Sequence, residues 1–184
     1  MRTIDVVALF ATRGGERYGE SVTQLEHALQ CAALARRERA DDEVTLAALL
    51  HDVGHLLDRV PEHTEHHHGH QGAEWLRARV PRRIAWLVEH HVVAKRYLCT
   101  VDPRYAERLS PASVRSLAVQ GAGLDVEQRL ALETQPWFAD AVRIRRWDDE
   151  AKVVGASPPP LIAYRALLEH WLGPQSWPSA PGIA

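Results

Sequence analysis

The spacing of apolar residues along this chain is that of helices packed against one another. Between Val22 and Arg37 the apolar positions recur at three- to four-residue intervals, which predicts a buried helix. Asp42 is a suitable N-cap for a second helix. The apolar pattern extends this helix to Leu57, and Pro61 prevents it from continuing.

Capping residues, prolines and glycines delimit the remaining helices. Ser110 followed by Pro111 marks a helix start, because proline fits the first helical position. Asp125 is a candidate cap for the helix after it, and Pro136 separates that helix from the next. The predicted ranges are 71–79, 82 to about 93, 110–121, 125–132, 137–152 and 161–172. No segment alternates with the period of a strand, so the sequence predicts an all-α fold.

The 184 residues are enough for one domain with a substantial core. We expect a single domain over 1–184, with its core at about 18–152 and a C-terminal helix at about 160–173. The three prolines at 158–160 form a stiff connector, but the segment after them is too short to fold alone.

Composition narrows the class of protein. The net charge is −2, and no basic run suggests binding to nucleic acid or to a membrane surface. The first ten residues lack the apolar run of a signal peptide, and no stretch reaches the length of a membrane span. We therefore expect a cytoplasmic protein with no membrane or nucleic-acid partner, whose oligomeric state the sequence leaves open.

Histidine is the unusual residue. The chain has 11, and most of them lie between His51 and His91. Such a local enrichment points to metal binding or acid–base chemistry.

The strongest single feature is the segment Leu-Leu-His51-Asp52-Val-Gly54-His55. Burying a histidine beside an aspartate is costly unless a cation or hydrogen bonds compensate. A carboxylate can bridge two metal ions, and Gly54 lets another backbone or a ligand approach closely. By itself the His-Asp pair also fits a helix end that is only capped or hydrogen-bonded.

Further potential ligands lie on other helical segments. They are His27, His68 and His70 on either side of Gly69, the pair His90 and His91, and Asp148. Histidines and carboxylates on five separate segments are the arrangement by which helical bundles build metal sites in their cores.

This pattern resembles the HD-domain superfamily, in which a histidine, a His-Asp pair and a distal aspartate bind metal. His27, His51, Asp52 and Asp148 match these four ligands. His68 and His91 match the two extra histidines of a dinuclear site. His68 is chosen because it lies four residues before Gly72-Ala73, and His91 because it shares a helical register with Leu87 and Lys95.

Longer segments resemble the phosphonate-cleaving HD-domain diiron oxygenases. They are Gly19 to Ala32, His91 to Leu98, Leu109 to Ser113 and Arg145 to Asp148. In that family a mixed-valent pair of iron ions, Fe2+/Fe3+, uses O2 to cut the carbon–phosphorus bond of a 1-hydroxyalkylphosphonate. The resemblance assigns one iron to His27, His51 and Asp148, and the other to His68 and His91, with Asp52 bridging. The ligand set alone suits iron or manganese.

The same resemblance implies a pocket for the phosphonate dianion. Lys95 and Arg145 supply positive charge. Ser113, Ser116 and Gln120 share one helix face and would donate hydrogen bonds. His55, one turn beyond His51, would contact a phosphonate oxygen.

Glu20 would face an amino or ammonium group of the substrate. In the family a tyrosine three residues before this glutamate can occupy an iron position until substrate arrives. Arg17 stands in that slot here, and Tyr18, beside it, is the candidate for the role.

The implied substrate is a 1-hydroxy-2-aminoethylphosphonate, with a free amine or a trimethylammonium group, and the products are inorganic phosphate and glycine or betaine. The main alternative is a metal-dependent HD-domain phosphohydrolase acting on phosphate esters or nucleotides. A noncatalytic metal- or phosphonate-binding regulator and a diiron oxygenase acting on a polyol are further alternatives.

Overall fold

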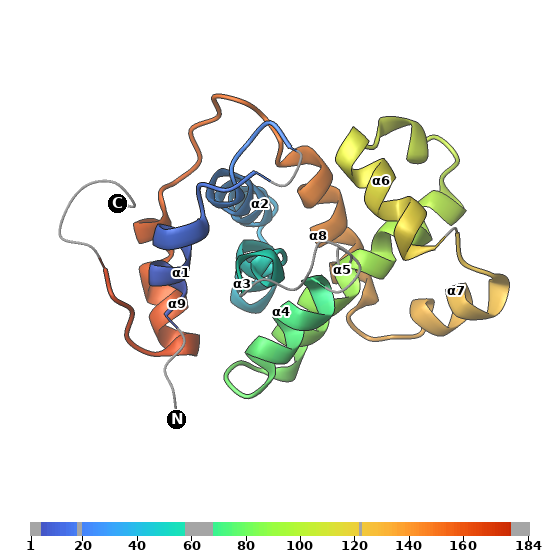
Figure 1. The fold of residues 1–184 in the computed structure, drawn as a ribbon. Helices are drawn as coiled ribbons and strands as arrows, with labels where there is room; N and C mark the ends of the chain where they lie inside the picture. The colour runs from blue at the N-terminus through green and yellow to red at the C-terminus, as the bar shows by residue number, and fades with distance from the viewer. Residues whose placement is uncertain (1–4, 18–19, 58–67, 122, 178–184) are drawn as a thin grey trace.

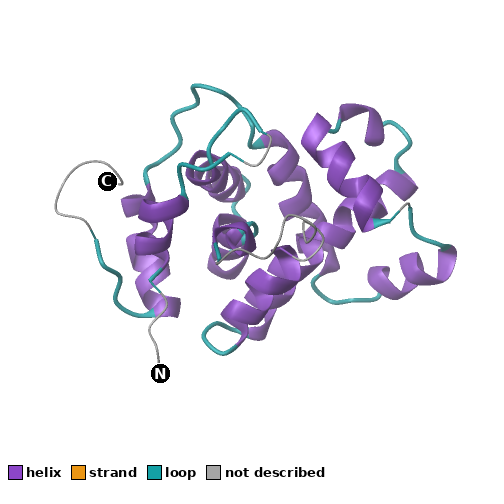
Figure 2. Cartoon of the chain, viewed as in Figure 1, coloured by secondary structure: helices purple, strands orange, loops and turns teal. Residues whose placement is uncertain are grey.

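The computed structural model describes residues 5–17, 20–57, 68–121 and 123–177, and every regular element in these ranges is helical (Figure 2). The α-helices are α1 Val6–Arg13, α2 Gln24–Arg37, α3 Asp42–Leu50, α4 His68–Arg77, α5 Arg82–Val101, α6 Pro111–Gln120, α7 Val126–Glu133, α8 Phe138–Glu150 and α9 Arg165–Leu172. Short 3₁₀ turns lie at Val53–Leu56, Ala106–Arg108 and Leu161–Tyr164. The predicted all-α class is confirmed.

Side-chain caps start several helices where the sequence predicted a start. The Ser110 hydroxyl accepts from the Ser113 N–H at 3.1 Å at the start of α6, with Pro111 at the first helical position. Asp125 caps α7. The cap of α3 is Asp41 rather than the predicted Asp42, because the Asp41 carboxylate accepts from Val44 N–H at 2.9 Å.

One helix was missed, and three predicted helix boundaries are clearly wrong. The sequence did not predict α1, a short helix capped by Asp5. Helix α3 ends at Leu50 instead of Leu57, and the chain turns into a 3₁₀ segment. Helix α4 begins at His68 instead of residue 71. Helix α5 continues to Val101, past the predicted end near residue 93, because its buried face includes the charged Lys95 as well as apolar residues.

Helix α5 lies at the centre of the bundle (Figure 1), where it packs against α3, α4 and α8, while α2 packs against α3 and α8. The fully buried side chains of these helices are large and apolar. Burying them stabilises the fold, because the free energy gained grows with the apolar area removed from water. They include Leu46, Leu49, Leu50, Ile84, Leu87, Ile144 and Trp147. The helices that carry the histidines and aspartates are therefore the helices that form the core.

The segment after the prolines at 158–160 belongs to the same core. Leu161, Tyr164 and Leu168 are buried in it, and α9 packs against α3. The described ends of the chain meet beside α9 (Figure 1), where Val6 N–H donates to the Gln175 side chain at 2.8 Å. None of the helices that the described residues form is long and apolar enough to cross a membrane.

Helix α6 stands apart from this core. Ser113 is the only buried residue in the helix, while Val114 and Val119 are half exposed. Figure 1 shows α6 against the C-terminal half of α5, at the opposite end of the molecule from α1 and α9. Polar contacts rather than apolar burial therefore fix how α6 faces the rest of the fold.

Candidate metal centre and anion pocket

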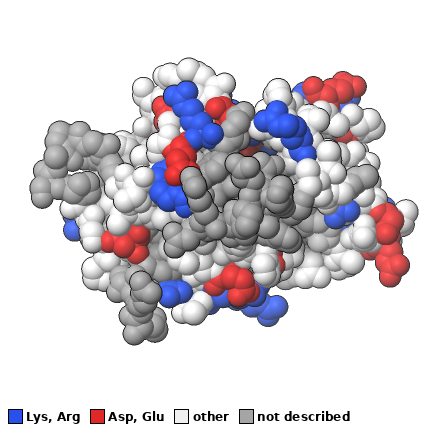
Figure 3. Space-filling model, viewed as in Figure 1, with Lys and Arg blue, Asp and Glu red and all other residues white. Residues whose placement is uncertain are grey.

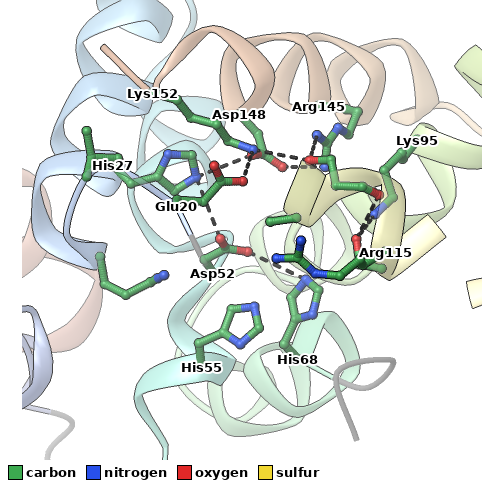
Figure 4. Close-up of a pocket in the computed structure, with 15 residues that line it drawn as sticks. Glu20, His27, Asp52, His55, His68, Lys95, Arg115, Arg145, Asp148 and Lys152 are labelled. Carbon is green, nitrogen blue, oxygen red and sulfur yellow. Dashed lines mark hydrogen bonds and ion pairs between the residues drawn. The ribbon is translucent and has the colours of Figure 1, made fainter. Parts of the chain in front are cut away.

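Five core segments bring six potential ligands to one place, and Figure 4 shows four of them, His27, Asp52, His68 and Asp148. We call this set of six the ligand cluster, and its histidines are all buried. Its members are His27 in α2, His51 at the end of α3, Asp52 just after it, His68 at the start of α4, His91 in α5 and Asp148 in α8.

The first half of the ligand cluster comprises His27, His51 and Asp148. The two Nε2 atoms lie 3.2 Å apart, and His27 Nε2 lies 3.3 Å from Asp148 Oδ1. Two donors at neighbouring positions around a transition-metal ion, each about 2.1 Å from it, lie about 3 Å apart. These separations therefore suit one metal ion held between the three side chains.

The second half comprises His68 and His91, whose Nε2 atoms also lie 3.2 Å apart. Asp52 stands between the halves. Its Oδ1 lies 3.5 Å from Nε2 of His68 and 3.5 Å from that of His91. Its Oδ2 lies 3.5 Å from Nε2 of His51 and 3.6 Å from that of His27. Each carboxylate oxygen thus faces a different histidine pair, as a carboxylate that bridges two metal ions does.

Backbone carbonyls fix which nitrogen of the histidines faces inward. Nδ1 of His27, His51 and His91 lies 2.8, 2.8 and 2.7 Å from the carbonyl oxygens of Ala151, Ala48 and Val88. A carbonyl only accepts, so Nδ1 carries the proton and Nε2 presents a lone pair. Metal-binding histidines are oriented in this way. The facing lone pairs of His27 and His51 cannot bond each other, and a cation between them resolves the conflict.

The charges of the cluster agree with this arrangement. Burial opposes ionisation of Asp148, but Arg145 and Lys152 beside it hold the pKa of that carboxyl well below its usual value. Burial lowers the pKa of His51 to about 4, which keeps that imidazole neutral. Burial opposes protonation of His27, but Asp148 and Asp52 outweigh burial and raise the pKa of His27, so this imidazole would release a proton when a metal ion binds. Ionised carboxylates and neutral imidazoles are the protonation states that bind metal.

His55 lies next to the second half of the ligand cluster. Its ring stacks on that of His68, with centroids 4.2 Å apart, and both rings line the cavity in front of the cluster. His55, Asp52 and His68 also offer three donor atoms within reach of one ion. The geometry therefore places His55 where it can meet either a ligand in the cavity or a metal ion.

Glycine at position 54 lets α4 approach the His-Asp turn. A side-chain carbon on Gly54 would lie 2.0 Å from the backbone oxygen of His68, and one on Gly72 would lie 3.1 Å from Val53. The close backbone approach expected at Gly54 is thus made by His68 itself. It brings His68 to Asp52, and it explains why the helix before His51 does not continue.

A group with two buried cations lines the same cavity as His55. We call Lys95, Ser113, Ser116 and Arg145 the anion pocket, because all four line the cavity beside the ligand cluster. Lys95 Nζ donates to Ser116 Oγ at 2.5 Å. Burial and the neighbouring charge of Arg145 lower the pKa of Lys95 to about 8, so the ammonium still predominates at neutral pH.

Arg145 is held by a network of acceptors. Its Nη1 lies 2.5 Å from Asp148 Oδ2, its Nη2 pairs with Asp149, and its Nε donates to the Tyr105 hydroxyl oxygen at 3.0 Å. Nη2 also lies 3.5 Å from Ser113 Oγ. These contacts fix the plane of the guanidinium group. On the face drawn in Figure 3, lysines and arginines lie among aspartates and glutamates, whereas Lys95 and Arg145 are only 3% and 4% exposed.

Gln120 is not brought to this pocket, contrary to the sequence prediction. It lines a second hollow, together with His70, Glu89 and Arg96. Ser113 and Gln120 do share a helix face, but seven residues displace them by about 10 Å along the axis. Sharing a helix face with Ser113 is therefore not enough to bring Gln120 to the cavity.

Glu20 lines the cavity, as expected, but it already has a cationic partner. Its Oε1 lies 2.9 Å from Lys152 Nζ and accepts from the Ser110 hydroxyl at 2.7 Å. Tyr18, the candidate for the family tyrosine, lies outside the described residues.

Sequence reasoning missed three other polar residues that line the cavity, namely Gln24, Arg115 and Lys152. The spacing of Lys152, four residues after Asp148, was a usable signal, because that interval returns to the same helix face. Arg115 gave no such signal, since it is an exposed residue of α6. In Figure 4 its side chain reaches from α6 toward Asp52 and His68.

Comparison with known proteins matches this chain to one family and to named enzymes. The model of the HD domain matches residues 24–123. The chain is 42% identical over 180 residues to hydroxymethylphosphonate dioxygenase of Gimesia maris, covering 93% of this chain and 88% of that protein. It is 38% identical over 150 residues to the glycine-betaine-forming [1-hydroxy-2-(trimethylamino)ethyl]phosphonate dioxygenase of Leisingera caerulea, covering 78% and 76%.

Proposed function

Because this chain belongs to the HD-domain family and, within it, to the phosphonate-cleaving oxygenases, we propose that it cleaves the carbon–phosphorus bond of a 1-hydroxyalkylphosphonate with O2. The products are inorganic phosphate and a carboxylic acid. The observation that carries the proposal is the position of Asp52, with one carboxylate oxygen toward each histidine pair, next to the buried cations Lys95 and Arg145.

We propose two iron ions as the cofactor. His27, His51 and Asp148 would hold one, His68 and His91 the other, and Asp52 would bridge them. When bound, the iron pair supplies the redox chemistry by which O2 is activated, which no amino-acid side chain provides. The protein's part is to hold the ligands, bind the phosphonate and keep its charge neutralised.

Lys95 and Arg145 would bind the phosphonate dianion. Arg145 presents a guanidinium plane that Tyr105 and Asp149 hold in place. Lys95 adds a point charge, and its ammonium group is oriented by a hydrogen bond to Ser116. Because both cations are buried, solvent screens their charges little, but Asp148 and Asp149 already offset part of the charge of Arg145. Ser113 and His55 would complete the hydrogen bonds to the phosphonate oxygens. In the absence of substrate, Tyr18 would stand in the role of the family tyrosine.

The 1-hydroxyalkylphosphonates differ in the substituent attached to C1, and this substituent defines the substrate more finely. The sequence favours a 2-amino-1-hydroxyethylphosphonate or its trimethylammonium analogue, because Glu20 would receive a cation. The Leisingera relative is named for a trimethylammonium substrate and the Gimesia relative for hydroxymethylphosphonate, which has no nitrogen. The contacts of Glu20 bear directly on this choice.

The experiment is phosphate release by protein loaded with iron, in air and without oxygen. Hydroxymethylphosphonate and both nitrogen-containing substrates would be offered beside simple phosphate esters. We expect phosphate only from 1-hydroxyphosphonates and only with O2. Release from the esters in both atmospheres, with none from any phosphonate, would instead identify an HD-domain phosphohydrolase.

The metal is tested separately. Protein reconstituted with iron is compared with protein reconstituted with manganese, with metal content and turnover measured on the same samples. We expect two iron ions per chain and activity only in the iron sample. Activity with manganese alone would contradict the cofactor assignment.

A further inference from the structure

Three carboxylates line the cavity among the described residues. Asp52 and Asp148 face the histidines of the ligand cluster. Glu20 alone is left to receive a positive group on a substrate. Whether a cationic substrate fits therefore depends on what already contacts Glu20.

Lys152 makes that contact. It lies two residues after the end of α8, and its side chain is 15% exposed. Its Nζ lies 2.9 Å from Glu20 Oε1, 3.2 Å from Ser113 Oγ and 3.6 Å from Asp148 Oδ1. Lys152 therefore brings a full positive charge to the one carboxylate that could serve a substrate cation (Figure 4).

A substrate ammonium at Glu20 would meet the Lys152 ammonium at the same carboxylate. Like charges brought together in a shielded site strongly disfavour binding, and this is a common device for rejecting a competing ligand. Nothing comparable opposes a substrate without a charged tail, because Lys152 then keeps Glu20 neutralised.

We propose that Lys152 is a specificity-determining residue that selects 1-hydroxyalkylphosphonates lacking a cationic substituent, of which hydroxymethylphosphonate is the smallest. This inference rests on the proposed function. For that substrate the reaction balances as hydroxymethylphosphonate dianion plus O2 giving formate plus dihydrogen phosphate. The carbon–phosphorus bond breaks, the carbon is oxidised and O2 is reduced, with one oxygen atom of O2 entering each product.

The first test uses the unmodified protein. Dissociation constants for hydroxymethylphosphonate and 2-amino-1-hydroxyethylphosphonate are measured by calorimetry on metal-loaded protein without oxygen, and kcat/KM for both is measured in air. We expect hydroxymethylphosphonate to be favoured by about 100-fold or more in both quantities. Equal or better binding of the amino compound would overturn the proposal.

The second test changes the charge of Lys152 while keeping its length. In Lys152→Met, the preference for hydroxymethylphosphonate should fall about tenfold or more, because Glu20 is released. Adding Glu20→Gln to that variant should remove the gain for the amino compound. Lys152→Arg, which keeps the charge, should keep the preference. An unchanged ratio in Lys152→Met would overturn the proposal.

Lys95→Met is the matched control, because it removes the other lysine of the cavity without touching Glu20. It should weaken both phosphonates alike and leave their ratio unchanged. A loss of the proposed function looks different: binding without oxygen would still favour hydroxymethylphosphonate, but no phosphate would be released in air. If Lys152→Met fails to fold, the ratio in unmodified protein and in Lys152→Arg still decides the question.

Discussion

The ligand cluster and the anion pocket face the same cavity but are held in place by different forces. Seven of the nine residues of α3, the helix that ends at His51, are buried, whereas α6 buries Ser113 alone. Apolar packing positions the histidines, and charged contacts position α6. We infer that the metal site tolerates little change in its supporting helices, while the substrate side can be altered one contact at a time.

The largest expected effect breaks the ligand cluster at its centre. Asp52→Asn removes the negative charge between the two histidine pairs, so the second metal ion should be lost. Since a catalytic metal contributes several kcal/mol and each 1.4 kcal/mol is tenfold, kcat should fall by about 1000-fold or more. Metal analysis and phosphate release would measure this, and two metal ions per chain in the variant would contradict the bridging role.

A second variant breaks the cluster through its backbone. In Gly54→Ala the added carbon meets the His68 carbonyl, so α4 must move away from Asp52. We expect a loss of about 2 kcal/mol in the free energy of unfolding, as for other overpacked sites, together with weaker binding of the second metal. Urea denaturation and metal titration would test this. Gly15→Ala, at a position with open space, is the control.

On the substrate side, Lys95→Met should raise KM without releasing metal. Truncating one partner of a buried charge pair costs about 2–5 kcal/mol, so we expect a loss of about 100-fold in kcat/KM. Steady-state kinetics and metal content on the same preparation would separate the two regions. Loss of metal from Lys95→Met would show that the ligand cluster and the anion pocket are not independent.

The pH dependence of kcat/KM tests the role of Lys95 in a second way. Lys95 has a pKa of about 8, so it is charged below that pH and neutral above it. Binding of the phosphonate should therefore weaken as pH rises through 8, by up to about tenfold per unit in kcat/KM. Lys95→Arg should abolish this limb of the profile, since arginine stays protonated. An unchanged profile in Lys95→Arg would rule out Lys95 as its source.

The smallest effect is expected at Ser116. Its hydroxyl accepts from Lys95 and donates to the Ser113 carbonyl oxygen, so it orients the ammonium group without carrying charge. Ser116→Ala should reduce kcat/KM by about 3- to 10-fold, the usual range for one hydrogen bond. A loss as large as that of Lys95→Met would mean that the hydroxyl itself carries most of the binding.

Local patterns in the sequence predicted much of the fold. The starts of α6 and α7 follow from Ser110-Pro111 and Asp125, whose side chains act on the backbone three residues away. The ends of α3 and α5 were wrong because they depend on contacts between helices: α3 stops where Gly54 meets His68, and α5 continues where Lys95 is buried among other helices.

The residues of the ligand cluster could be named from the sequence, because adjacent His51 and Asp52 are a local signal and the longer segments resemble one family. Their joint arrangement could not. That Asp52 divides its two oxygens between two histidine pairs depends on where α2, α4 and α5 cross, which no single segment specifies.

Short-range periodicity and motifs are enough to predict an all-helical protein of the HD family with a set of candidate metal ligands. The positions of Gln120, away from the cavity, and of Lys152, in contact with Glu20 across 132 positions of the chain, emerge only from the packing of the helices. A residue's type and helical face are local properties. Its distance from a charge on another helix depends on how the whole core packs.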